Sequence, residues 1–171
     1  MKICDTVNSK LYKNDRAILH SDCNCFYASV ECLLNPNIRD LPVAVSGDAE
    51  NRHGIILAKN EEAKKYNIKT GEAIWQAKKK CPQLLTVPAR LDVYKKFSDK
   101  VRRIYSDYTD MVEPFGLDEA WLDISEDYKN DALTIAKEIS QRVKDEIGIT
   151  VSIGVSFNKI FAKFGKIGRA S

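Results

Sequence analysis

The chain has 171 residues, of which 44% are hydrophobic and 30% charged, and its formal net charge is +3. That length allows one or two domains with a real core, and the composition is ordinary for a soluble globular protein. No apolar run approaches the roughly 18–20 residues of a membrane span, and residues 1–16 lack the apolar core of a signal peptide. We therefore expect a cytoplasmic protein without a membrane segment, in which residues 1–16 are a lead-in.

The cysteines are odd in number and show no Cys-x-x-Cys spacing; they are Cys4, Cys23, Cys25, Cys32 and Cys81. Without an export signal, such cysteines indicate reduced thiols and not a disulfide framework. The spacing of Cys23 and Cys25 is also too tight for the usual structural zinc site.

Charge is unevenly distributed along the chain. Residues 59–103 carry 13 Lys or Arg against 5 acids, residues 113–146 carry 4 against 10, and residues 155–171 carry 4 against none. Basic surfaces suit nucleic acid and triphosphate, whereas an acidic segment suits cations. Lysines that merely solvate helices would give the same basic segments, so this pattern alone leaves both interpretations open.

The first half of the chain predicts a small α/β arrangement. In chain order the expected elements are a strand over 17–21, a helix over 25–34, strands over 42–45 and 55–58 paired as a hairpin, helices over 60–66 and 72–80, and a strand over 84–87.

The second half predicts a longer helix, a hairpin, a helix and a strand. Apolar residues recur at three- and four-residue steps over 91–109 and again over 131–147, a strand follows over 149–155, and a last helix starts at Asn158. Together with the first strand this order is βαββαβ, so we expect an α/β (α+β) protein with a ferredoxin-like sheet and a small α/β lobe inserted over 28–89.

An adjacent acid pair, Asp118 and Glu119, lies between two apolar runs and follows Gly116, which indicates a β-hairpin with the acids at its tip. Neighbouring side chains in a strand point to opposite faces, but at a turn two carboxylates can converge on a hard divalent cation such as Mg²⁺. A charged surface turn would look the same. A third acid, Asp22, ends an apolar run near the start, and acids on two neighbouring strands can hold two metal ions for displacement at phosphorus.

Four separated motifs then carry a resemblance. They are Asp22–Ala28 (DCNCFYA), Pro42–Val45 (PVAV), Gly116–Ala120 (GLDEA) and Asn158–Lys163 (NKIFAK). In this order they resemble the Y-family (translesion) DNA polymerases, in the branch that contains DNA polymerase IV. The resemblance covers about residues 17–164, and implies a palm over 17–27 and 90–164 with a fingers domain over 28–89.

The resemblance implies a metal site of two Mg²⁺ ions, which Mn²⁺ could replace. Asp22 and Asp118 would hold the ions, Glu119 would assist at the ion that activates the primer hydroxyl, and the backbone carbonyl of Cys23 would complete a site. The implied activity is template-directed transfer of deoxynucleotides to a primer 3′-end.

The resemblance also implies a nucleotide-binding set of Cys25, Phe26, Tyr27, Lys64 and Lys163. Tyr27 would lie under the sugar and exclude a 2′-hydroxyl, so Tyr27→Ala would admit ribonucleotides. The two lysines would contact the triphosphate, and backbone N–H groups at the helix start around Cys25 suit phosphate oxygens.

Some positions depart from the family pattern. Many members have Tyr at the position of Glu61, Arg at that of Lys64 and an acid at that of Asn24; an acid at 61 would repel a triphosphate unless it points away. Residues 165–171 do not continue the pattern, so we expect a palm and fingers fragment without the thumb and little-finger domains.

The expected partners are primer–template DNA and a deoxynucleoside triphosphate, with a sliding clamp bound through the missing C-terminal region. A non-catalytic DNA-binding accessory module is an alternative, although Asp22, Asp118 and Glu119 are all retained. A nucleotide cyclase with a similar palm is a third interpretation, and the gate-like Tyr27 argues against it.

Overall fold

The computed structural model describes residues 16–47, 54–126 and 131–167, and the chain divides into two compact units. The larger unit consists of the residues up to Asn24 and those from Lys96 on, and the smaller unit runs from Cys25 to Lys95. The expected lead-in lies outside the described residues up to position 15, and residues 168–171 of the end that does not match the family pattern lie outside them as well.

The larger unit is built on a four-stranded sheet. Its strands are β1 (Ile18–Cys23), β5 (Val112–Phe115), β6 (Glu119–Asp123) and β7 (Val151–Ser156), in the order β5-β6-β1-β7. Every neighbouring pair is antiparallel. β1 and β6 are therefore the central strands, which confirms the expected ferredoxin-like βαββαβ arrangement.

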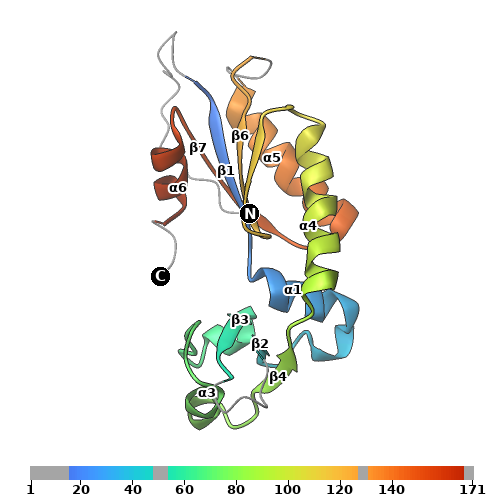
Figure 1. The fold of residues 1–171 in the computed structure, drawn as a ribbon, viewed down its shortest axis with the longest axis vertical. Helices are drawn as coiled ribbons and strands as arrows, with labels where there is room; N and C mark the ends of the chain where they lie inside the picture. The colour runs from blue at the N-terminus through green and yellow to red at the C-terminus, as the bar shows by residue number, and fades with distance from the viewer. Residues whose placement is uncertain (1–15, 48–53, 127–130, 168–171) are drawn as a thin grey trace. The chain divides into compact units, whose positions relative to one another are not determined.

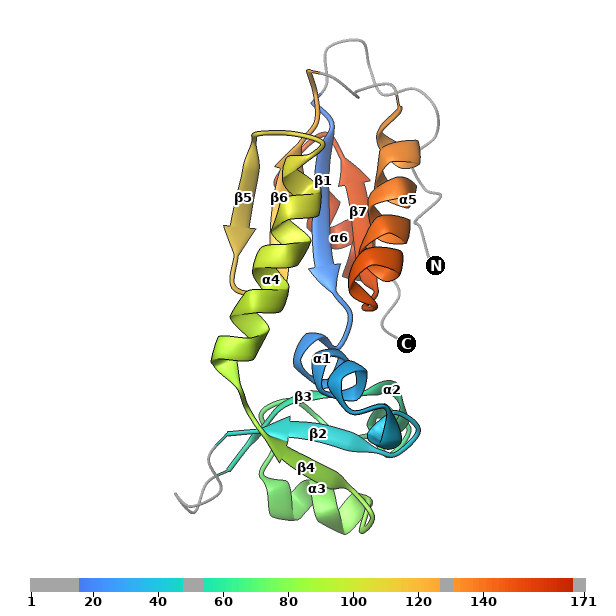
Figure 2. The ribbon, with the colours of Figure 1, turned by 90° about the vertical axis from the view of Figure 1, so that its right-hand side faces the viewer.

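Helices cover both faces of this sheet. α4 (Leu91–Ser106) and α5 (Ala132–Arg142) lie on one face, and α6 (Lys159–Ile167) lies on the other (Figures 1 and 2). The expected apolar stripe of α4 is buried at Val101, Ile104 and Tyr105. In contrast, three large apolar residues of α6 are exposed; they are Ile160, Phe161 and Phe164.

The smaller unit contains a three-stranded sheet and four short helices. Its elements are α1 (Phe26–Leu34), the 3-10 helix η1 (Pro36–Ile38), β2 (Val43–Ser46), β3 (Ile56–Lys59), α2 (Glu61–Lys64), α3 (Ile74–Lys80) and β4 (Leu85–Pro88). β2 is the middle strand, antiparallel to β3 as expected for the predicted hairpin and parallel to β4. Small and branched side chains fill its core, among them Ala44, Ile56, Ala63, Ile68, Ala77 and Leu84.

Several expected boundaries are wrong. β1 runs on to Cys23, so Asp22 lies within the strand and not after it. Glu119 is the first residue of β6, so only Asp118 of the acid pair lies in the turn. α2 is one turn long, and α4 ends at Ser106. The expected helix over 131–147 has the expected end, but its last part is a π-helical segment, η3 (Val143–Ile147), that follows α5 before Gly148.

Two further findings concern the described residues alone. None of their helices is both long and apolar enough to cross a membrane. Their four cysteines, Cys23, Cys25, Cys32 and Cys81, are not in disulfides.

Candidate active site

The central strands bring two of the predicted acids together. Asp22 of β1 pairs directly with Glu119 of β6, so the two side chains leave the same face of the sheet. Ser21, the preceding residue, points to the other face, where its hydroxyl bonds that of Tyr105 on α4 at 2.7 Å. The acids therefore lie on the face that carries α6.

The turn that carries Asp118 is fixed from both sides. The Cys23 N–H donates to the Asp118 carbonyl at 2.8 Å, and the Arg102 guanidinium donates to the Gly116 carbonyl at 2.5 Å. Gly116 has φ 71°, a conformation that favours glycine, which explains the Gly two residues before the acid. The hairpin therefore holds Asp118 beside the end of β1.

Glu119 is engaged by two positively polarised groups. Its Oε2 accepts a hydrogen bond from Nε2 of the buried His20 at 3.1 Å and another from Lys163 Nζ at 2.8 Å. The ammonium of Lys163 also lies over the rings of Phe115 and Trp121, at 4.9 and 5.5 Å from their centroids. Lys163 of α6 thus places its ammonium against Glu119, one of the acids predicted to bind metal ions.

The two adjacent acids have pKa values shifted in opposite directions. Burial is the largest single influence on each acid, and acting alone it would raise the pKa of both Asp118 and Glu119. For Glu119 the hydrogen bond and charge of Lys163, with those of His20, outweigh burial and lower the pKa. For Asp118 burial and the charge of Glu119 prevail and raise the pKa.

The three predicted metal acids are neighbours in the fold but do not form a ready ion-binding group. Within the part of the chain that the structure describes, no three His, Cys, Asp or Glu side chains lie close enough to hold a metal ion. The Glu119 carboxylate is bonded to Lys163 and His20. The donors themselves are carboxylate oxygens, the type that hard divalent cations prefer, so their chemistry fits the implied Mg²⁺.

Two polar residues of the larger unit have structural roles. Asn24, close to Asp22, donates to the Thr150 hydroxyl through Nδ2 at 3.0 Å and accepts from the Ser152 hydroxyl through Oδ1 at 2.6 Å, which ties the end of β1 to β7. Asp123, at the opposite end of β6 from Glu119, accepts from the backbone N–H of Ser125 at 3.0 Å.

The smaller unit carries the predicted nucleotide residues except Lys163. α1 begins after Cys25, which has the left-handed backbone angles φ 50° and ψ 38°. Phe26 is buried, whereas the ring of Tyr27 is half-buried and stacks on Tyr94 at 4.4 Å and 15° between planes. A left-handed non-glycine residue is strained, and such strain concentrates at functional sites.

Tyr94 is itself fixed by a buried carboxylate. Its hydroxyl donates to Glu31 at 2.7 Å, and Arg90 donates to both oxygens of the same carboxylate, at 3.0 and 2.5 Å. The ring that stacks on Tyr27 is therefore buried and is fixed by its hydrogen bond to the Glu31–Arg90 pair.

Glu61 does not point away from Lys64. Its Oε1 accepts from Lys64 Nζ at 2.7 Å and from the Cys25 thiol at 3.3 Å. The carboxylate thus contacts two of the predicted nucleotide residues at once.

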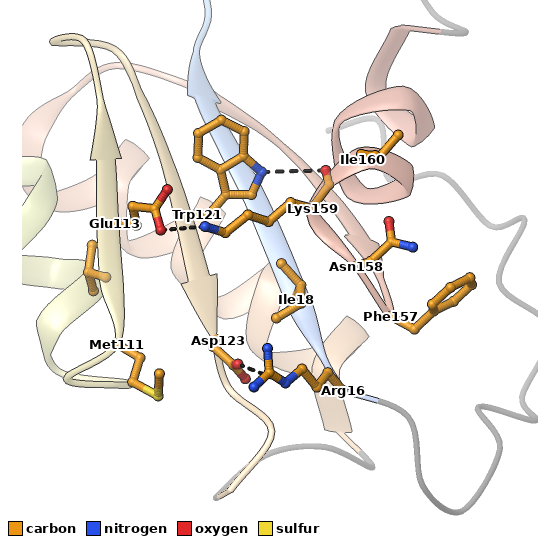
Figure 3. A pocket seen from close by; sticks show the side chains of 11 residues that line it. Arg16, Ile18, Met111, Glu113, Trp121, Asp123, Phe157, Asn158, Lys159 and Ile160 are labelled. Atoms are coloured by element: carbon orange, nitrogen blue, oxygen red, sulfur yellow. Dashed lines mark hydrogen bonds and ion pairs between the residues drawn. The ribbon is translucent and has the colours of Figure 1, made fainter.

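A separate pocket of about 700 Å³ lies on the α6 face of the larger unit (Figure 3). It lies toward the Ile18–Asp123 end of the central strands, whereas the acids lie at the Asp22–Glu119 end. Its charged side chains are paired with each other, Lys159 with Glu113 and Arg16 with Asp123. This pocket is therefore separate from the acid site.

His20 is the site residue that sequence reasoning missed. It lies two residues before Asp22 in the same strand, so strand alternation places both on one face. That alternation was the available signal, because it predicts that His20 shares the face of the acids.

Comparisons with known proteins agree with this architecture. The impB/mucB/samB family matches over residues 21–166. The chain is 60% identical over 152 residues to DNA polymerase IV of Acetivibrio thermocellus, covering 88% of this chain and 38% of that protein. It is 45% identical over 152 residues to DNA polymerase IV of Bacteroides fragilis, covering 88% and 41%.

Solved structures give the same result. DinB from Sulfolobus solfataricus matches with a TM-score of 0.81 and 31% identity, over 86% of this chain and 44% of that one. An insertion ternary complex of Dbh DNA polymerase matches with a TM-score of 0.81 and 30% identity, over 86% and 44%. The chain spans about two fifths of the length of these relatives. It belongs to the impB/mucB/samB family, and the expected resemblance to the Y-family polymerases is confirmed.

Proposed function

We propose that this chain carries the palm and fingers of an error-prone translesion DNA polymerase that acts in damage tolerance. The palm is the larger unit and the fingers the smaller one. The observation that carries the proposal is the cross-strand pairing of Asp22 with Glu119 beside Asp118, in a chain 60% identical to a DNA polymerase IV.

The three acids supply the oxygen ligands for catalysis. Asp22, Asp118 and Glu119, with the backbone carbonyl of Cys23, would hold two Mg²⁺ ions, for which Mn²⁺ can substitute. Bound there, the ions would neutralise the triphosphate and favour in-line attack by the primer 3′-hydroxyl. One described property supports this role: Lys163 and His20 lower the pKa of Glu119, so its side chain is kept as a carboxylate.

Lys163 has two roles in this proposal. In the structure its ammonium neutralises Glu119 at 2.8 Å. With divalent ions on the acids, that neutralisation is no longer needed, and the ammonium is available to the triphosphate. The rings of Phe115 and Trp121 lie beside this ammonium.

The smaller unit binds the incoming deoxynucleotide in this proposal. The backbone N–H groups at the start of α1, around Cys25 and Phe26, and the ammonium of Lys64 bind phosphate oxygens. Tyr27 excludes the 2′-hydroxyl, and its stack on Tyr94 supports that role because a fixed ring selects by shape.

The remaining assignments concern the whole protein and follow from its proposed function. Primer–template DNA and a deoxynucleoside triphosphate are its substrates, and a sliding clamp is a partner through regions beyond those matched here. DNA synthesis in damage tolerance places the protein in the cytoplasm.

Primer extension tests the proposal. The longest product of this reading frame would be assayed with Mg²⁺ beside an Asp118→Ala, Glu119→Ala double variant, with Asp123→Asn as a matched acid outside the site. We expect extension by the parent and by Asp123→Asn, and a loss of at least about 100-fold in the double variant. A Tyr27→Ala variant is expected to incorporate ribonucleotides that the parent rejects.

The outcome also decides between the two classes of function. The alternative is a non-catalytic DNA-binding module that keeps the fold. Tight DNA binding without extension by the parent would replace the polymerase with that module. Equal primer extension by the parent and the double variant would show that Asp118 and Glu119 are not needed for catalysis.

A further inference from the structure

The one-turn helix α2 is anchored at its first residue. The side chain of Asn60, which precedes it, accepts from the N–H groups of Ala63 at 2.9 Å and Val43 at 3.0 Å, and donates to the Leu41 carbonyl at 2.7 Å. Asn60 is buried, so these bonds join α2 to the start of β2 without competition from water. The positions of Glu61 and Lys64 in the smaller unit are therefore set by the fold.

The Glu61 carboxylate joins two segments that are far apart in the sequence. Its Oε1 accepts from Lys64 Nζ at 2.7 Å within α2, and from the Cys25 thiol at 3.3 Å at the start of α1. Both segments are the ones proposed to bind phosphate oxygens. One negatively charged group therefore lies against the groups that an anionic ligand would use.

The pair is ionic. Burial, the largest influence, lowers the pKa of Lys64, but the hydrogen bonds of Glu61 and Cys25 outweigh it and raise the pKa. The ammonium is thus charged at neutral pH, and its charge is already matched by a carboxylate. A triphosphate that binds Lys64 must either displace Glu61 or tolerate its negative charge nearby.

A matched pair begins at the next residue of the same helix. Glu62 and Lys65, the residue that follows α2, have the same three-residue spacing, with Nζ at 2.7 and 2.6 Å from the two carboxylate oxygens. This gives a control with the same charges and the same separation along the chain.

We infer that Glu61 sets the nucleotide affinity of this protein by competing with the triphosphate for Lys64. The inference rests on the proposed function, in which Lys64 binds the triphosphate. Glu61 weakens ground-state binding of deoxynucleoside triphosphates, so it raises KM and leaves kcat nearly unchanged. Glu61 acts on affinity through its charge and is not one of the acids proposed to hold the metal ions.

The test is the substitution Glu61→Gln, which keeps the shape and the acceptor oxygen but removes the charge. Binding of dTTP with Mg²⁺ would be measured by calorimetry, which needs no turnover. We expect binding about three- to tenfold tighter than in the parent, because an exposed carboxylate–lysine pair and one nearby like charge have effects of this order. Glu62→Gln should change it less than twofold, and the Glu61→Gln effect should shrink at high salt.

A double-variant cycle separates the inference from the function on which it rests. Lys64→Gln should weaken dTTP binding, and adding Glu61→Gln to it should then have little further effect. If Lys64→Gln weakens binding but Glu61→Gln does not tighten it, the inference is overturned and the proposed role of Lys64 survives. If Lys64→Gln binds dTTP as the parent does, the role of Lys64 and the inference both fail.

Discussion

Glu119 of the larger unit and Glu61 of the smaller unit each bind a lysine at nearly the same distance, 2.8 Å to Lys163 and 2.7 Å to Lys64. Otherwise the pairs differ. Glu119 and Lys163 are 44 residues apart, with side chains 20% and 38% exposed, and two aromatic rings lie beside the ammonium. Glu61 and Lys64 are three residues apart, with side chains 72% and 45% exposed.

This difference indicates that the distance between the two charges does not by itself decide how much a carboxylate–lysine pair contributes to stability. The Glu119 pair forms only when β6 and α6 have packed on the same sheet, so it depends on the whole larger unit. The Glu61 pair forms on a single helical turn, and water screens it. We expect the burial of the carboxylate to decide the effect on stability, and the smaller unit offers three glutamates with which to test this.

The largest stability effect is expected at Glu31, the most buried of these glutamates, which binds Arg90 and the Tyr94 hydroxyl. Glu31→Gln removes the charge and leaves a buried phenol and a guanidinium with poorer partners. We expect the free energy of unfolding to fall by about 2–3 kcal/mol, somewhat less than for a fully buried pair because Arg90 is half-exposed. Urea unfolding with a common m-value measures it, and a loss as small as that of Glu62→Gln would contradict the argument.

An intermediate effect is expected at Glu72, whose mostly buried carboxylate binds Lys80 at 2.5 Å. Burial is the largest influence and raises the pKa of Glu72, but the hydrogen bond from Lys80 outweighs it and lowers the pKa below the ordinary 4.5. The pair therefore stabilises the fold above pH 4.5, and its contribution is lost as the pH falls through the lowered pKa. Glu72→Gln should cost about 1 kcal/mol at pH 7.

The pH dependence gives the Glu72 prediction its control. The difference in unfolding free energy between the parent and Glu72→Gln should shrink steadily below pH 4.5. A difference that stays constant down to pH 3 would show that the charge of Glu72 is not its cause, and that the substitution acts through packing.

The sequence predicts the backbone of the larger unit well, because apolar periodicity is a local signal. The hairpin of β5 and β6 follows from it and is confirmed. The residues at which the helices and strands end cannot be predicted from apolar periodicity. Pairing with β6 and β7 on both sides extends β1 beyond its apolar run to Cys23, so Asp22 faces Glu119 across a ladder and not across a turn.

The side-chain partners of the site are harder to predict. Glu119 meets His20 over 99 residues of sequence and Lys163 over 44, and only the packed sheet brings them together. The assignment of Asp22, Asp118 and Glu119 to metal ions stays a prediction. Glu61 and Lys64 are three residues apart on a helix, so their pairing could have been predicted, but the contact with Cys25 depends on how α1 packs.

The smallest stability effect is expected at Glu61. Because both side chains of its pair are exposed, Glu61→Gln should change the unfolding free energy by no more than about 0.5 kcal/mol, as should Glu62→Gln. Thermal and urea unfolding of the two variants measure this. A loss above 1 kcal/mol for Glu61→Gln alone would mean that its contact with Cys25 holds α1 and α2 together, and a structural role would then compete with the proposed one. With stability unchanged, any change in dTTP binding must come from the charge that Glu61 places beside Lys64.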